Sequence, residues 1–254
     1  MTARSFGITG SVDLAVIRRL APLVESAGYR ALWINDTPSG DALTAMAAAA
    51  ETTTTLGLAS GVIPLDRVGG AEIARRVREL GLPTDRLRIG IGSGGTRHGL
   101  ALLARGVADL RAGTDAPVVI GGMGPRTRAL AARVADGILL TRLTPETAAD
   151  AMAELRSDAA GRAVEGILYA RTIADPAARD ALAEEVARYA AIPAYAANEA
   201  RLGFDPARTT VDLTVPGSVD AFDAVDELVL RAITPTGAER ELVTLLEAGA
   251  PSRG

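Results

Sequence analysis

Two glycine-rich turns contain the residues best suited to holding a ligand. Gly92, Ser93, Gly94 and Gly95 follow one apolar run, and Gly121, Gly122, Met123 and Gly124 follow another. Glycine lets backbone N–H groups approach an anion closely, and a helix beginning near Arg126 would turn its positive end toward the second turn. The pattern predicts a site for a cofactor phosphate, although glycine also occurs in turns simply because their backbone requires it.

Three polar residues are candidates for catalysis. His98 is the only histidine, and histidine is the side chain whose ordinary pKa lies near neutrality. It could donate a proton or contact a substrate, or it could be an exposed residue beside a helix start. Asn35 and Asp36 end an apolar run, where they could contact cofactor or substrate, or belong to a capping turn before Pro38 and Gly40.

Arginine supplies all the positive charge besides His98, because the chain contains no lysine. This excludes Schiff-base chemistry, and the absence of cysteine excludes thiolate sites. A single histidine without thiols also argues against a metal site. Arg142, Arg171 and Arg231 follow or lie within apolar runs, and each could meet a carboxylate or phosphate of a cofactor tail or be an ordinary surface residue.

The elements that position these residues alternate along the chain. We expect strands at Phe6–Ile8, Ala31–Ile34, Leu56–Val62, Leu87–Ile91, Val118–Ile120, Gly137–Leu140, Ile167–Ile173 and Glu227–Leu230. We expect helices at Val12–Ala27, Asp41–Thr52, Gly70–Leu80, Gly99–Ala112, Arg126–Val134, Pro145–Ala160, Pro176–Ala190 and Thr236–Ala248. Eight strands, each followed by a helix, predict one α/β domain over residues 1–254, a (β/α)8 TIM barrel with both glycine turns on its C-terminal rim.

One segment does not fit this alternation. Prolines and glycines interrupt any periodicity between Ala191 and Phe222, so this stretch could be a lid or an extra short helix between the seventh and eighth strands.

Composition narrows the classes of partner. A net charge of -4 argues against nucleic-acid binding. The N-terminal segment has no apolar stretch long enough for a signal peptide or a membrane span. We therefore expect a soluble, cytoplasmic protein that acts on a small molecule and binds neither nucleic acid nor membrane.

Three segments together resemble the luciferase-like monooxygenase family. They are Thr55–Pro64, Pro83–Gly94 and Pro117–Arg126, the last followed by Ala131–Gly137. The resemblance implies a barrel that binds FMN or the deazaflavin coenzyme F420, with F420 as first choice, and a homodimer. It also implies a non-prolyl cis peptide at Gly61–Val62. The cofactor-binding residues would be Ser60, Gly61, Val62, Gly92, Ser93, Gly94, Gly121, Gly122, Met123, Gly124, Arg126 and Thr127.

The chain departs from the family in three places. Thr37 stands where many members that oxidise alcohols have a histidine, and Gly95, Thr96 and Arg97 replace expected carboxylates. Only the segment from Thr96 to Ala116 stands in place of the family's usual long insertion. These departures favour hydride transfer involving an activated substrate over oxidation of an alcohol. A non-catalytic flavin-binding barrel, an FMN-dependent monooxygenase and an unrelated phosphate-binding barrel remain as alternatives.

Overall fold

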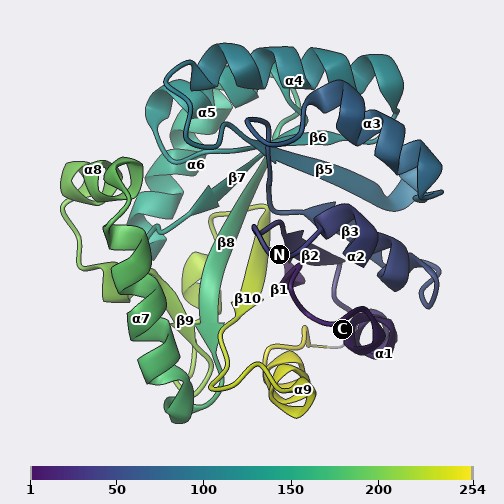
Figure 1. Ribbon diagram of the computed structural model, residues 1–254. Coiled ribbons are helices and arrows are strands. Elements are labelled where there is room, and N and C mark those ends of the chain that lie inside the picture. Colours follow the sequence, from purple (N-terminus) through teal and green to yellow (C-terminus); the bar gives the residue numbers. More distant parts are fainter. Residues whose placement is uncertain (1, 253–254) are drawn as a thin grey trace.

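Residues 2–252 are described by a computed structural model, in which parallel strands form a closed barrel surrounded by helices (Figure 1). The strands are β1 (Ala3–Thr9), β2 (Ala31–Asn35), β3 (Gly57–Ser60), β4 (Ile63–Pro64), β5 (Leu87–Gly92), β6 (Val118–Gly121), β7 (Gly137–Thr141), β8 (Glu165–Ile173), β9 (Thr210–Asp212) and β10 (Glu227–Ala232). The helices are α1 (Leu14–Ser26), α2 (Ala42–Ala50), α3 (Gly70–Glu79), α4 (Gly99–Gly113), α5 (Pro125–Val134), α6 (Pro145–Ala159), α7 (Arg179–Ala190), α8 (Pro193–Leu202) and α9 (Glu239–Ala248).

The barrel closes between its first and last strands. Neighbouring strands follow the order β1, β2, β3, β5, β6, β7, β8 and β10, and β10 pairs in parallel with both β8 and β1. The short β4 continues β3, because both pair with β5 at successive positions along it. The eight-stranded barrel predicted from the sequence is confirmed, and its carboxyl strand ends form one rim.

Side-chain caps fix some of the helix starts on the outside of the barrel, among them those of α2 and α6. The Asp41 carboxylate accepts hydrogen bonds from the Leu43 and Thr44 amides at 3.1 and 3.2 Å, which satisfies donors that a helix start leaves without partners. At α6, Thr144 is the N-cap and Pro145 takes the first helical position, where a missing amide costs nothing.

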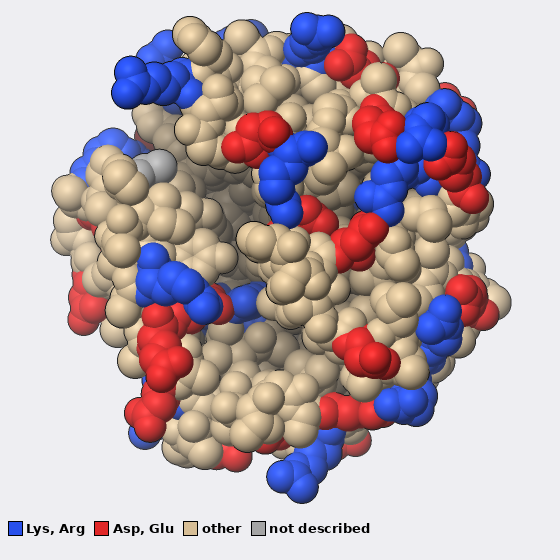
Figure 2. Space-filling view, viewed as in Figure 1, with Lys and Arg blue, Asp and Glu red and all other residues tan. Residues whose placement is uncertain are grey.

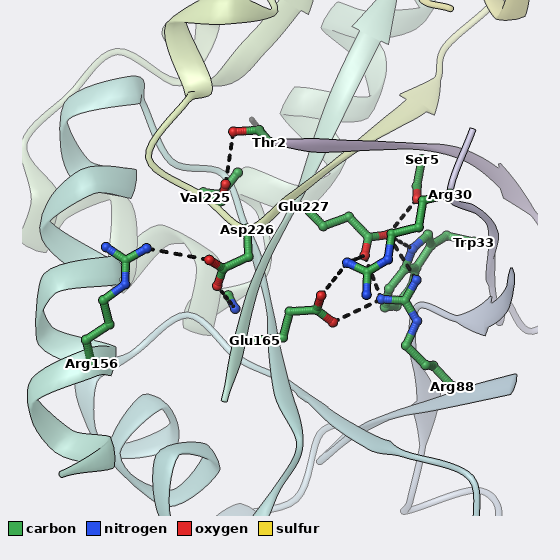
Figure 3. A network of polar contacts seen from close by, with 11 residues as sticks. Thr2, Ser5, Arg30, Trp33, Arg88, Arg156, Glu165, Val225, Asp226 and Glu227 are labelled. Atoms are coloured by element: carbon green, nitrogen blue, oxygen red, sulfur yellow. Dashed lines mark hydrogen bonds and ion pairs between the residues drawn. The ribbon is translucent and has the colours of Figure 1, made fainter. Parts of the chain in front are cut away.

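Side chains fill the N-terminal end of the barrel, around Glu227 (Figure 3). The Glu227 carboxylate is 0% exposed and accepts hydrogen bonds from Ser5 Oγ and Trp33 Nε1, both at 2.6 Å. Arg88 Nη1 lies 2.6 Å from the same carboxylate. Burial by itself would raise the pKa of Glu227, but the Arg88 charge and the hydrogen bonds from Arg88, Ser5 and Trp33 together outweigh burial and lower the pKa. Glu227 is therefore an anion, and the open space of the barrel lies toward the other end.

The irregular segment before the last strand contains α8, which confirms the expected extra short helix between the seventh and eighth barrel strands. Helix α8 packs against α7, and α7 in turn lies beside β8 (Figure 1). The short β9 pairs with the end of β8 outside the barrel order. A search of the described helices for one long and apolar enough to cross a membrane found none.

Candidate active site

A cavity of about 790 Å³ lies at the carboxyl ends of the barrel strands. Its walls come from the ends of β2, β4, β5, β6, β7, β8 and β10, together with α7 and α8. The middle of the face in Figure 2 is hollowed, and the blue of an arginine shows inside the hollow. A volume of this size is typical of small-molecule and cofactor sites.

The floor of the cavity is apolar and contains the predicted cis peptide. The Gly61–Val62 bond is cis, as expected from the resemblance. A Cβ atom on Gly61 would lie 3.2 Å from Leu139 Cδ2 and 3.2 Å from Trp33 Cε3, so this backbone lies directly against barrel side chains. Together with Val62 it presents a surface without charge to the cavity.

Val62 also explains why glycine is required in both turns. A Cβ on Gly92 would lie 2.7 Å from Val62 Cγ2, and a Cβ on Gly121 would lie 2.7 Å from Val62 Cγ1. Because real side chains do not approach so closely, only glycine lets Val62 sit between the two turns. The two turns therefore meet in one cavity, at the ends of β5 and β6.

The turn after β6 leads into an uncapped helix start. Gly124 is the N-cap of α5, no side chain caps it, and Pro125 follows at the first helical position. The first amides of a helix have no intrahelical partner, so those of Arg126 and Thr127 remain available to a ligand. A Cβ on Gly122 would lie 2.3 Å from Thr127 Cγ2, which shows how closely the turn packs on the helix.

The turn after β5 differs from the anion site expected there. The Gly95 amide donates a hydrogen bond of 2.8 Å to Asp66 Oδ2, and Gly94 has a φ of 63° beside the same carboxylate. A carboxylate that already holds the turn repels a second anion. Gly92, Ser93 and Gly94 line the cavity, and the Asp66 carboxylate beside them makes this turn less suited to an anion than the turn after β6, so their role in binding a cofactor stays a prediction.

The predicted catalytic residues are only partly brought together. Asn35 and Asp36 line the cavity, whereas His98 is exposed, lies at the N-cap of α4 and does not line it. Asp36 accepts a hydrogen bond from the Ala42 amide at 3.0 Å and pairs with Arg67 at 2.5 Å. Burial raises the pKa of Asp36, and these two contacts oppose the rise. Both carboxylate oxygens of Asp36 thus have partners in the protein.

The predicted cofactor residues fall into two groups. Those that line the cavity are Gly61, Val62, Gly92, Ser93, Gly94, Gly121, Gly122, Met123, Gly124 and Thr127. Ser60 and Arg126 do not. Ser60 is 0% exposed, and its hydroxyl donates to Gly90 O at 3.0 Å and accepts from Gly90 N at 2.9 Å. Its side chain links β3 to β5 instead of facing a ligand.

Three arginines to which the sequence assigned no definite role lie together on the side of the cavity formed by β7, β8, β10, α7 and α8. Arg142, Arg171 and Arg231 come from the ends of β7, β8 and β10, and all three line it. Glu185 of α7 accepts from Arg171 Nε at 2.9 Å and from Arg231 Nη1 at 2.5 Å. Burial and the neighbouring Arg171 charge lower the pKa of Arg142 to about 10. Arg142 therefore keeps its charge at neutral pH.

Sequence reasoning missed the wall built by tyrosines and α8. Tyr169, Tyr189 and Tyr195 all line the cavity, in a chain that has only four tyrosines. Tyr169 could have been found, because it lies two residues before Arg171 and alternate residues of a strand share a face. Tyr195 and Asn198 could not, because they belong to the segment without periodicity.

A scan against protein-family models gives the family. The model described as "Luciferase-like monooxygenase" matches residues 2–115 and 102–250. The chain belongs to the luciferase-like monooxygenase family. No curated protein matches it.

Solved structures show the same fold at low sequence identity. The F420-dependent tetrahydromethanopterin reductase from Methanopyrus kandleri is 17% identical, with 98% of each chain covered and a TM-score of 0.69. The monooxygenase RslO1 from Streptomyces bottropensis is 15% identical, with 98% of each chain covered and a TM-score of 0.75. The oxygenating constituent of 3,6-diketocamphane monooxygenase from Pseudomonas putida, in complex with FMN, is 13% identical, with 99% of each chain covered and a TM-score of 0.66.

This luciferase-like barrel has no histidine at position 37, and the structure shows what the position does. Thr37 pairs with Gly40 in a tight turn through backbone hydrogen bonds of 3.2 and 3.1 Å, and its carbonyl accepts from Arg67 Nη1 at 3.2 Å. Thr37 does not line the cavity. The backbone of Thr37 thus stabilises the turn before α2.

Proposed function

We propose that the chain is a luciferase-like oxidoreductase that uses reduced coenzyme F420, or alternatively FMN, for hydride transfer to or from a small organic substrate. The observation that carries this proposal is one continuous cavity that joins an apolar floor to the uncapped start of α5. Membership of the family supports the class of cofactor.

The residues present fit such a cofactor. The cavity of about 790 Å³ is large enough for a tricyclic ring. Gly61, Val62 and Leu139 offer that ring an apolar surface, and the amides at the start of α5 offer its phosphate their unpartnered N–H groups. When bound, the reduced cofactor supplies the hydride, and the protein supplies position and charge.

The protein's own groups exclude water and hold protons in place. Val62 and Leu139 cover the floor of the cavity. Tyr169 also lines the cavity, and burial raises the pKa of its hydroxyl. Tyr169 therefore stays protonated and can donate a hydrogen bond to a ligand. Asn35 lies at the rim, where its amide makes only a 3.4 Å contact with Asp36 O.

We infer a direction for the reaction from the carboxylates of the cavity. Asp36 is engaged by Ala42 and Arg67, and Glu185 is engaged by two arginines. Among the described residues that line the cavity, no other carboxylate and no histidine is present to take a proton from an alcohol. This arrangement favours reduction of an electron-poor C=C or C=N bond, which needs no strong base.

Single-turnover oxidation of the reduced cofactor tests the proposal. Protein loaded with reduced F420 or reduced FMN is mixed with compounds carrying activated C=C or C=N bonds under nitrogen, and the visible spectrum is followed. We expect at least one acceptor to oxidise the bound cofactor faster than the free cofactor. Faster oxidation only when oxygen is admitted, with one oxygen atom recovered in the organic product, would identify a monooxygenase instead. Rates equal to those of free cofactor with every acceptor would identify a cofactor-binding protein without catalysis.

A further inference from the structure

The arginines on the α7 and α8 side of the cavity are buried to an unusual degree. Arg142 is 2% exposed, Arg171 6% and Arg231 7%. Arginine is almost never this buried unless its charge is paired, because removing a cation from water costs several kcal/mol.

Positive charge exceeds negative charge within this cluster. Glu185 is shared between Arg171 and Arg231, and Glu199 of α8 forms an ion pair with Arg142. Two carboxylates therefore face three guanidinium groups, which leaves one positive charge without a partner among these five residues. An additional anion would balance the cluster.

Hydrogen-bond donors in the cluster are also in excess. Within the described part of the chain, the buried groups without a hydrogen-bond acceptor include Arg142 Nε and Nη1, Arg171 Nη1, the Tyr169 hydroxyl and Asn198 Nδ2. All four residues line the cavity. Buried donors in native proteins nearly always have an acceptor. A carboxylate or phosphate has only acceptor oxygens, and arginine binds such groups through paired N–H bonds.

Aromatic rings fix the arginines in position. Tyr195 of α8 stacks over Arg142 with the guanidinium carbon 5.7 Å from the ring centroid, and Tyr189 of α7 does the same for Arg171 at 5.6 Å. A guanidinium held by a ring loses less freedom when it binds a planar anion. The two helices therefore cover the cluster and orient it.

We propose that Arg142, Arg171 and Arg231 bind the oxyanion group, a carboxylate or a phosphate, of the substrate. The inference rests on the proposed function only in treating the bound anion as substrate. The cluster lies at the ends of β7, β8 and β10, whereas the start of α5 follows β6. The cavity thus has a place for a substrate anion that is separate from the turn assigned to the cofactor phosphate.

Calorimetric titration of the full chain with sodium benzoate and with inorganic phosphate tests the proposal. Each titration is run without cofactor and again with FMN or F420 present, so that failure of the proposed function does not hide anion binding. We expect saturable binding of at least one anion to one site per chain. Arg142→Gln should weaken it roughly 10- to 100-fold, since a hydrogen bond to a charged group is lost.

Two conservative variants keep the test informative if Arg142→Gln does not fold. Asn198→Asp is isosteric and can still accept the 2.8 Å hydrogen bond from Arg201 Nη2, but it adds a negative charge and should abolish binding. Tyr169→Phe removes one donor and should weaken binding roughly threefold to tenfold. Arg156→Gln is the matched control, because this exposed arginine on α6 lies outside the cavity and its loss changes net charge equally.

Two kinds of result would overturn the proposal. The first is that neither anion binds, or that binding is unchanged in Asn198→Asp and Tyr169→Phe. The second is that Arg142→Gln weakens F420, with its anionic tail, while FMN and the small anions bind as before. That pattern would assign the cluster to the cofactor tail instead of the substrate.

Discussion

Replacing Gly122 with alanine should block the turn that leads into α5. The Cβ of Gly122→Ala would lie 2.3 Å from Thr127 Cγ2 and 2.9 Å from Thr127 Cβ. Carbon atoms in contact normally lie about 3.5–4.0 Å apart. The turn and the first helical residues must therefore separate by roughly 1 Å, because both atoms belong to a short side chain fixed on the helix.

The expected loss of affinity follows from that displacement. A phosphate bound by helix amides accepts charge-assisted hydrogen bonds, and losing one costs about 1.5–3 kcal/mol. This corresponds to a dissociation constant roughly 10- to 100-fold higher. The free energy of unfolding of the protein without cofactor should fall by about 1–3 kcal/mol, the usual cost of one extra methyl group in a packed site.

Fluorescence titration with the cofactor measures the first effect, and thermal unfolding measures the second. The double variant Gly122→Ala with Thr127→Ser removes the methyl group at 2.3 Å and keeps the hydroxyl, so it should recover much of the affinity. Gly69→Ala is the control: Gly69 is the N-cap of α3, a Cβ there would meet nothing within 4 Å, and the residue lies outside the cavity. Cofactor affinity within twofold of the parent in Gly122→Ala, or equal losses in Gly69→Ala, would refute this reasoning.

Three further substitutions test other parts of the structure. Glu227→Gln should lower the free energy of unfolding by about 3 kcal/mol at pH 7, with cofactor affinity unchanged. Because the folded-state pKa of Glu227 is lowered, urea titrations should show this difference shrinking below the ordinary glutamate value of 4.5. Burial would raise the pKa of Glu25, but its carboxylate accepts hydrogen bonds from the Thr54, Thr55 and Leu56 amides, and the pKa is lowered to about 2. Glu25→Gln should therefore cost about 1 kcal/mol or more near neutrality, with the difference disappearing between pH 4.5 and 2; a constant difference would contradict the assignment. His98→Ala should change turnover by less than about twofold, and a tenfold loss would show that this exposed histidine reaches the substrate.

The barrel could be predicted from the sequence because its physical signal is repeated along the chain. Apolar runs such as Val118–Ile120 are too short for helices and are followed by amphipathic stretches, so eight repeats leave few other folds. The cis peptide came from the resemblance alone. Nothing in composition or periodicity would have indicated it.

The candidate site was only half predictable. Glycines directly after predicted strands indicate turns at the C-terminal rim of the barrel, and both glycine turns lie at that rim. Asp66, which holds the β5 turn, comes from a different loop, and its proximity depends on tertiary structure. The arginines were noticed singly, but the pairing of Arg171 and Arg231 with Glu185, and of Arg142 with Glu199, required the paths of α7 and α8 to be known. Homodimer formation stays a prediction, which light scattering can test.

Equilibrium titration of the protein with F420 and with FMN, each followed by its visible spectrum, tests the central claim most directly. We predict that one of the two binds at one molecule per chain with a shifted absorption band, and that Gly122→Ala weakens it as calculated above. If neither cofactor changes its spectrum at concentrations up to the solubility of the protein, the cavity is not a flavin or deazaflavin site.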